Sequence, residues 1–419
     1  MAMTDDHPNS TWLRDATAIA LGLTVPAMVS GRAVLQAIVA TALIAVLIIA
    51  WRDRAIFARA GAAVRSRFGM IVLAAFAGMA ISIPGSLDPL RSFEAWARTL
   101  AYIVGCVLFW AYLAGDARAN TLCRRTFILG CAAGTALVIS AQLGLTLPLQ
   151  AVRNTFGAVS GAWAAAALKA YAASMSCAVP VLIWCAWHSA GKWRWLAGLA
   201  AFGAGAVIIE TANKAAIAGL LASALTVSLA VSMQRRGKWL PVWALWAAGA
   251  VTATVALVHV LPDAPPSTAV WDWMPTWLVD THRQQIWHFV GGKIAESPWF
   301  GHGINVIDRI PGAHEKIPGY TVEYIPSHPH NWILEVLGET GVIGFLPVAF
   351  VLAWFLARHA RRFVRSGQPV DMALIGLFSV FWTSSLFNFS IWSSWWLITF
   401  FLLSAIIAAE PDRPAAQPE

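Results

Sequence analysis

Long apolar runs, separated by short polar stretches, recur along almost the whole chain and decide what it can fold into. A helix needs about 20 mostly apolar residues to cross the roughly 30 Å hydrocarbon core of a bilayer. The runs show no strand alternation of the kind a membrane barrel requires. Because 58% of the 419 residues are hydrophobic and only 12% are charged, the sequence predicts an all-α polytopic membrane protein. About 12 transmembrane helices are expected, at 12–30, 33–51, 69–87, 95–114, 127–146, 168–187, 195–212, 214–233, 239–261, 332–357, 370–388 and 392–409.

The basic residues predict the orientation of these spans. With a cytoplasmic N-terminus, 19 of the 29 lysines and arginines fall on the cytoplasmic side, as the positive-inside rule requires. Both termini are therefore expected in the cytoplasm. The first run lacks a small-residue cleavage site after it, so we expect it to be retained as a helix. The basic residues are divided among short loops, which gives no support to nucleic-acid binding.

The pattern divides the chain into residues 1–261 with spans 1–9, a periplasmic loop domain at 262–331, residues 332–409 with spans 10–12, and a cytoplasmic tail at 410–419. Within the loop domain, "DTHRQQIWHFVGGKIAES" predicts a short amphipathic helix capped by Asp280 or Thr281 and lying along the membrane. "PWFGHGIN" then predicts a tight turn, followed by irregular structure. The five cysteines fall in or beside the spans, so no disulfide framework is expected.

The stretch "IPSHPHNWILEVLGETGVIGF" places a polar cluster at the outer end of span 10. Ser327 is expected to cap this helix, with His330 in its first turn. Asn331, Glu335 and Glu339 follow at a spacing of four residues and form one polar stripe. Since ionisable groups at this depth are costly, the stripe is expected to face other helices or a wet cavity.

On this map three distant residues meet at the same membrane face: Lys214 at the outer end of span 8, Arg283 in the loop helix, and His330. Arg153 and Lys169 fall on that face too. Several loop histidines are available, but none has the spacing of a metal site, so neither a metal nor another cofactor is expected.

Two quoted segments resemble the paired signature of the O-antigen ligase and O-antigen polymerase superfamily. "DTHRQQIWHFVGGKIAESPWFGHGIN" supplies an arginine and a tryptophan ahead of a Pro-x-x-Gly-x-Gly turn, and "HPHNWILEVLGETGVIGF" supplies His-Asn before a helix with a glutamate and a Gly-x-x-Gly ending. The strong resemblance covers residues 280–345. One departure is Lys214, where the family usually has arginine, so a point charge replaces a bidentate group.

The resemblance implies a GT-C-type glycosyltransferase of the bacterial inner membrane, most like an O-antigen ligase. Such an enzyme moves a glycan from undecaprenyl diphosphate to lipid A-core at the periplasmic face, in contact with membrane lipids. His330 is expected to act as the general base, and Arg283 and Lys214 to stabilise the departing diphosphate. With no obvious nucleophilic carboxylate, inversion is favoured. Glu335 and Glu339 are both candidates to orient His330, and the expected substrate contacts are Arg153, Lys169, Asn331, Glu335 and Trp287.

Three alternatives stay open. An O-antigen polymerase and a protein O-oligosaccharyltransferase belong to the same superfamily. Polymerases are described with Arg-x10-Gly spacing, whereas the residue eleven positions after Arg153 is Ala164 and that after Arg283 is Ile294, which favours a ligase. A transporter of lipid-linked glycans would place its binding groups near the bilayer midplane in repeated halves, and neither feature is present in the sequence.

Overall fold

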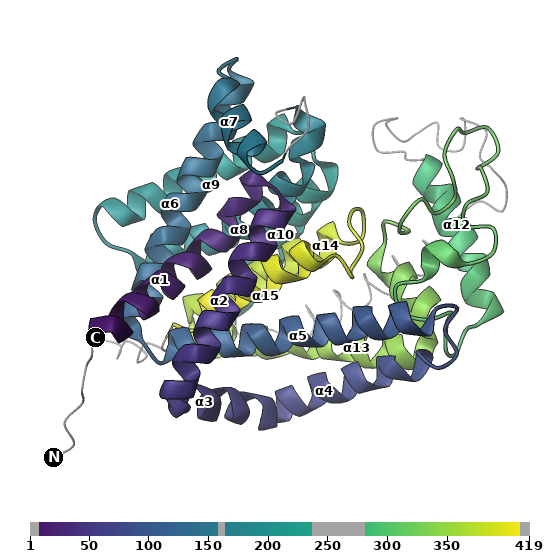
Figure 1. The fold of residues 1–419 in the computed structure, drawn as a ribbon, viewed down its shortest axis with the longest axis horizontal. Coiled ribbons are helices and arrows are strands. Elements are labelled where there is room, and N and C mark those ends of the chain that lie inside the picture. The colour runs from purple at the N-terminus through teal and green to yellow at the C-terminus, as the bar shows by residue number, and fades with distance from the viewer. Residues whose placement is uncertain (1–7, 158–163, 237–280, 411–419) are drawn as a thin grey trace.

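The computed structural model describes residues 8–157, 164–236 and 281–410 (Figure 1). Regular structure in these ranges consists of helices and one isolated antiparallel bridge between Lys316 and Glu323. The α-helices are α1 (Pro8–Thr24), α2 (Arg32–Arg52), α3 (Arg54–Arg65), α4 (Arg67–Met79), α5 (Pro89–Ala114), α6 (Ala117–Gln142), α7 (Leu147–Thr155), α8 (Lys169–His188), α9 (Lys192–Glu210), α10 (Lys214–Arg236), α12 (Thr281–Glu296), α13 (Trp332–Ser366), α14 (Pro369–Ser384) and α15 (Ser394–Ala408). Short 3-10 turns are η1 (Pro26–Ser30), η2 (Ala80–Ser82), η3 (Ala165–Leu168) and η4 (Ile307–Arg309).

The expected fold class is confirmed, since the described chain is helical and carries several membrane-length apolar helices. Seven of the described helices are long and apolar enough to cross a membrane, or eight if α3 and α4, which meet at a 71° bend, form one broken span. Helices α1, α14 and α15 lie at expected spans but are shorter. The expected span 239–261 lies outside the described residues, so the total of 12 stays a prediction.

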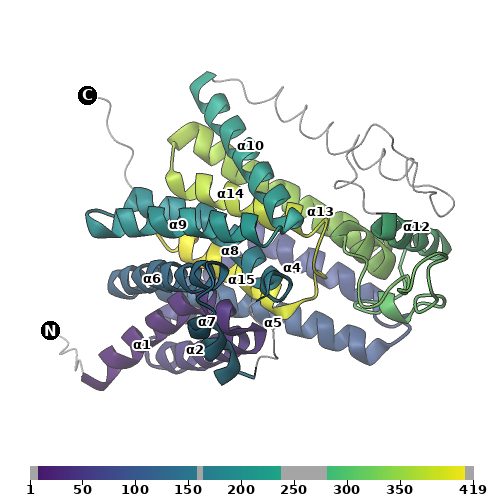
Figure 2. The ribbon, with the colours of Figure 1, turned by 90° about the horizontal axis from the view of Figure 1, so that it is seen from above.

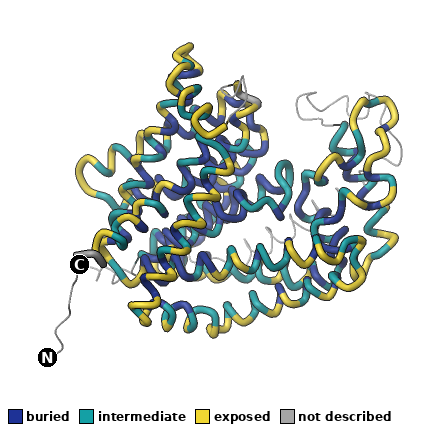
Figure 3. The backbone as a smooth tube through the Cα atoms, in the orientation of Figure 1, coloured by how far each residue is buried: buried dark blue, intermediate teal, exposed yellow. Residues whose placement is uncertain are grey.

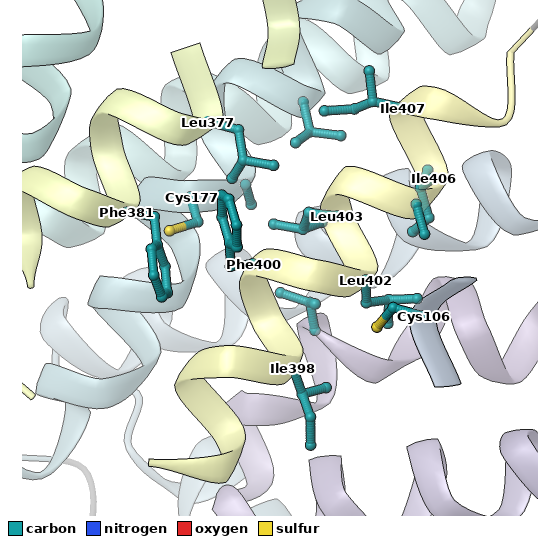
Figure 4. Packing of buried hydrophobic residues seen from close by; sticks show 14 of the residues in the cluster. Cys106, Cys177, Leu377, Phe381, Ile398, Phe400, Leu402, Leu403, Ile406 and Ile407 are labelled. Carbon is teal, nitrogen blue, oxygen red and sulfur yellow. The ribbon is translucent and has the colours of Figure 1, made fainter. Parts of the chain in front are cut away.

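Helices α14 and α15 form the centre of the packing. They lie among α5, α8, α10 and α13, and Figure 3 shows the buried backbone concentrated there. The Phe381 ring stacks on Trp396 at 4.6 Å and on Phe400 at 4.5 Å between ring centroids. Aliphatic side chains fill the rest of this core (Figure 4). Because both helices are held on several sides, the connection between them is fixed at its two ends.

The loop domain is a separate small core at one end of the bundle (Figure 2). The apolar side of α12 contributes Ile286, Trp287 and Val290, which pack against Ile307 and Leu334 among others. The loop domain itself and α13 therefore cover the apolar side of α12, and the expected position of this helix along the membrane stays a prediction. The irregular structure expected after the "PWFGHG" turn is present.

Ion pairs attach the loop domain to the start of α5. Arg91 contacts the Asp308 carboxylate at 3.0 Å, and Arg309 pairs with Asp88. Ser92 Oγ also donates to the Ile304 carbonyl at 2.8 Å. These contacts consequently attach the loop domain to the membrane helices.

Helix α13 is broken at Gly341, whose φ of 60° and ψ of −170° are not helical. The turn at 298–303 fits into this break. The His302 and Gly303 amides donate to the carbonyls of residues 338 and 339 at 3.0 and 2.8 Å, while the amides of residues 342 and 343 donate to the carbonyls of residues 298 and 299 at 2.9 and 3.2 Å. The backbone groups freed by the break thus form hydrogen bonds, as burial requires. The contact between the turn at 298–303 and the break in α13 is called here the joint.

Candidate active site

His330 lies immediately before α13 in a left-handed backbone conformation, with φ of 55°. Asn331 caps the helix, because its Oδ1 accepts from the amides of Ile333 at 3.0 Å and Leu334 at 3.2 Å. The expectation that Ser327 caps the helix and that His330 sits in its first turn is therefore wrong. Ser327 Oγ instead lies 2.8 Å from His328 Nδ1. A positive φ is uncommon for histidine, and such strain recurs at functional sites.

The connection between α14 and α15, residues 385–393, is called here the α14–α15 loop; it points toward the loop domain (Figure 1). The carbonyl oxygen of Asn388 lies 2.9 Å from His330 Nδ1 and 3.0 Å from His328 Nε2. The two imidazole rings lie 4.2 Å apart between centroids. Two histidines of the loop domain therefore contact one backbone carbonyl of the membrane core.

These contacts fix the tautomers of both rings, since a carbonyl oxygen only accepts. His328 must donate from Nε2 to Asn388, which leaves its Nδ1 to accept from the Ser327 hydroxyl. His330 must donate from Nδ1, which leaves the basic lone pair of a neutral ring on Nε2. In neutral His330, Nε2 is therefore the ring nitrogen that carries the lone pair.

His328 is held uncharged by its surroundings. Burial, the His330 ring and the positive charges of Arg283 and Arg32 lower the pKa of His328 to about 3, although the bond to the Asn388 carbonyl opposes this shift. His328 is therefore neutral at neutral pH. The positive charges of Arg283 and Arg32 thus act on the His328 ring.

Arg32, the first residue of α2, was not singled out from the sequence. Its guanidinium lies 5.2 Å from the ring centroid of Trp395 and 5.8 Å from that of Phe389, so it covers the α14–α15 loop from the side of α2. Arg153 on α7 lies in the same region, donating from Nη1 to the Val29 carbonyl at 3.0 Å. Its Nε is buried with no hydrogen-bond partner among the described residues, and burial lowers the pKa of its guanidinium.

Lys214 and Lys169 are brought together at two adjoining helix starts. Lys214 begins α10 and Lys169 begins α8, and both are exposed. Asn213 links the two starts, because its Nδ2 donates to the Lys169 carbonyl at 3.0 Å and its Oδ1 accepts from the Ala216 amide at 3.2 Å. Two lysines beside two helix N-termini favour the binding of an anion.

Two hydrogen bonds at the end of α14 connect the start of α10 to the start of α13. Ser384 Oγ, at the end of α14, donates to the carbonyl of Ala215 at 3.0 Å. The next residue, Ser385, accepts from the Trp332 amide at 3.1 Å. The end of α14 thus lies between the residue after Lys214 and the residue two after His330.

The two glutamates of α13 are buried and face the α14–α15 loop. Glu335 accepts from Ser390 Oγ at 2.5 Å and from the Ile391 amide at 2.9 Å. Glu339 accepts from Trp392 Nε1 at 2.5 Å and from the Ile307 amide at 3.3 Å. Both glutamates of the expected polar stripe are buried, but they contact this loop and the loop domain instead of other helices or a wet cavity. None of these four contacts reaches His330.

Trp287 also supports the histidines from the side of α12. Its indole Nε1 donates to the Pro329 carbonyl at 3.0 Å, and its side chain is 8% exposed. With Trp287 on one side and Asn388 on the other, residues 328–330 are held between the loop domain and the membrane core. The roles of Trp287, Asn331 and Glu335 in substrate contact stay predictions.

The arrangement therefore combines an imidazole of defined tautomer with nearby cations from α2 and α12 and further cations at the starts of α8 and α10. It suits a reaction in which an alcohol loses a proton and an anionic leaving group departs. The described residues contain no group of three or more metal-ligating side chains.

Fold and site define a polytopic, all-α membrane protein whose loop domain docks a histidine pair onto the connection between two buried helices. A family model described as O-antigen ligase matches residues 199–349. This match shows that the chain is similar to the O-antigen ligase family over residues 199–349. The matched stretch includes Lys214, Arg283 and His330, but neither Arg32 nor the α14–α15 loop.

Proteins named "putative polysaccharide ligase" from three Rickettsia species are similar to parts of the chain. The protein of Rickettsia conorii is 29% identical over 119 residues, covering 28% of each chain. That of Rickettsia typhi is 27% identical over 141 residues, covering 31% of this chain and 33% of the relative. That of Rickettsia prowazekii is 23% identical over 167 residues, covering 39% and 40%. The matches thus span well under half of these relatives.

Proposed function

We propose that this chain is a membrane glycosyltransferase of the O-antigen ligase type. It transfers a glycan from undecaprenyl diphosphate to a sugar hydroxyl of lipid A-core at the periplasmic face of the bacterial inner membrane. The observation that carries this proposal is the His330 imidazole, held in one tautomer by the Asn388 carbonyl and packed beside His328. The positive charges of Arg283 and Arg32 act on the His328 ring.

In the proposed reaction, the acceptor hydroxyl gives its proton to His330 Nε2. Its oxygen attacks the anomeric carbon, and the bond from that carbon to the diphosphate breaks with the electron pair leaving on the phosphate oxygen. One displacement inverts the anomeric configuration. Arg283 and Lys214 stabilise the negative charge that develops on the diphosphate. The chemistry needs no metal, because fixed side-chain cations supply the positive charge.

The reaction site follows from the nature of both reactants. Donor and acceptor are lipids whose sugars project from the membrane, and the histidine pair lies where the loop domain meets the helix ends. A base placed there meets the sugar headgroups without drawing them into the hydrocarbon core. The names of the similar Rickettsia proteins favour a ligase over a polymerase.

The test uses purified protein in lipid nanodiscs with undecaprenyl diphosphate-linked glycan and lipid A-core, in the presence of EDTA. Glycosylated lipid A-core is the expected product. Longer lipid-linked glycan without acceptor transfer would identify a polymerase, transfer only to an added protein would identify an oligosaccharyltransferase, and donor movement without a new bond would identify a transporter.

His330→Asn is the informative variant. Asparagine tolerates a positive φ, and its Nδ2 can replace Nδ1 as donor to the Asn388 carbonyl, so the fold is preserved while the base is removed. We expect kcat to fall by about 10²–10⁴-fold. Turnover at the normal rate would remove His330 from the mechanism. Arg283→Gln should weaken donor binding as well as turnover, whereas Arg283→Lys keeps the charge.

A further inference from the structure

The two glutamates of α13 lie one turn apart, yet they hold different partners. Glu335 holds Ser390 and Ile391 within the α14–α15 loop. Glu339 joins Trp392 to the loop domain through the amide of Ile307. Of these two glutamates, Glu335 is the one whose contacts both lie within three residues of Asn388, whose carbonyl meets the histidines.

We propose that Glu335 is a positioning residue for His330, acting through the backbone of the α14–α15 loop, and that the Asn388 carbonyl is the group that orients the imidazole. This inference rests on the proposed role of His330 as general base. A backbone oxygen thus orients the imidazole, a role that a carboxylate usually fills.

The geometry of the loop explains how the Glu335 carboxylate can position His330 without contacting it. Asn388 lies two residues before Ser390 and three before Ile391, and Trp392 continues from there into α15. With its Ser390 and Ile391 side fixed by Glu335, the loop cannot turn the Asn388 carbonyl away without breaking buried hydrogen bonds. Glu335 itself is 1% exposed, so those bonds have no water to replace them.

The opposite end of the loop is anchored separately. Trp332 donates its amide to the Ser385 carbonyl at 3.1 Å, and Trp396 Nε1 donates to Ser385 Oγ at 2.8 Å. Residues 386–389 therefore span two fixed points. The carbonyl of Asn388 is set by both, and the Glu335 carboxylate is the group that fixes the second.

Glu335→Ala should lower kcat by about 100-fold, the loss expected when a catalytic group is displaced by about 1 Å, while the KM for the donor stays close to normal. Glu335→Gln is the matched control. Its amide oxygen can accept from the Ile391 amide and its NH2 can donate to Ser390 Oγ, so we expect it to recover most of the kcat that Glu335→Ala loses. Ser390→Ala removes one of the two contacts and should give an intermediate loss, which keeps the test available if Glu335→Ala fails to fold.

A double-variant cycle separates positioning from general structural support. If Glu335 acts through the base, Glu335→Ala should change the small residual rate of His330→Asn by less than about threefold. Losses that multiply would overturn the proposal. Asn388→Ala keeps the carbonyl, so a loss as large as that of Glu335→Ala would overturn the assignment of the orienting group.

The outcomes also distinguish this inference from the proposed function. Normal turnover by His330→Asn would refute the base itself. An inactive His330→Asn alongside normal turnover by both Glu335→Ala and Ser390→Ala would refute the positioning role alone.

Discussion

Replacing Gly341 with alanine should open the joint between the 298–303 turn and the break in α13. A Cβ at residue 341 would lie 2.3 Å from both the carbonyl carbon and the oxygen of Trp299, and 2.5 Å from the Phe300 nitrogen. These are backbone atoms, so no side chain can rotate away. The backbone conformation at residue 341, with φ of 60° and ψ of −170°, is in addition open almost only to glycine.

The size of the effect follows from these two terms. The backbone conformation costs an L-residue about 1–3 kcal/mol. Relief of the overlap requires the turn to move by about 1 Å, which breaks the bonds from the amides of Val342 and Ile343 at about 1 kcal/mol each. Their sum is about 3–5 kcal/mol, and since 1.4 kcal/mol is tenfold in an equilibrium, the joint should open at least about 100 times more often.

Hydrogen exchange of the amides at 302, 303, 342 and 343, measured in nanodiscs, would detect this opening. Gly292→Ala is the matched control, because a Cβ there meets no atom within 4 Å and alanine favours a helix by up to about 1 kcal/mol. Glycan transfer should fall with the opening in Gly341→Ala and stay normal in Gly292→Ala. If the four amides of Gly341→Ala exchanged as slowly as those of the wild type, the joint would not depend on this glycine.

The other predictions concern charge and burial around the α14–α15 loop. Because the pKa of His328 is about 3 when packed and near 6.5 when open, the open form alone takes up a proton as pH falls below 6.5. The free energy that favours the packed loop over the open loop should therefore fall by about 2 kcal/mol by pH 5. His328→Gln, which keeps an Nε2 donor, should show a shallower pH dependence of hydrogen exchange at 385–393. Glu339→Ala leaves the Trp392 indole and the Ile307 amide buried without an acceptor, and should lower thermal stability by several kcal/mol, seen as a lower unfolding temperature in detergent; an unchanged temperature would argue against those contacts. Arg32→Gln should raise the donor KM about tenfold, with Arg32→Lys closer to normal, and equal KM values for all three proteins would place the diphosphate elsewhere.

The sequence predicted the helical membrane architecture because it is a consequence of composition and spacing. Apolar runs of membrane length have few alternatives to helices, and a polar segment of about 70 residues between spans cannot lie in hydrocarbon. The same reasoning predicts that His330 and Arg283 lie on one membrane face. Helix starts were harder to predict, since Ser327 and Asn331 are both good caps and only the structure shows that the Asn331 side chain reaches two amides.

The α14–α15 loop could not be predicted as part of the site, because its contribution is made by the backbone. Its sequence, "SLFNFSIWS", contains no ionisable residue. Every residue has a backbone carbonyl, so the sequence does not indicate which carbonyl meets an imidazole. Arg32 was missed for a related reason: on its own it is one of many arginines near a membrane surface. What sets it apart is the packing of its guanidinium near Phe389 and Trp395, a contact between α2 and the far end of the chain.

The break in α13 connects these observations. An unbroken helix would satisfy its own backbone and could not accept the turn at 298–303. Because the break lies two residues after Glu339, the bonds that repair it also fix the loop domain against the part of α13 that carries Glu335 and Glu339. Those glutamates in turn hold the α14–α15 loop, whose Asn388 carbonyl meets the histidines. A glycine about three turns from His330 is thus expected to affect catalysis through a continuous series of buried hydrogen bonds, and substitution of a surface residue at the same distance is not.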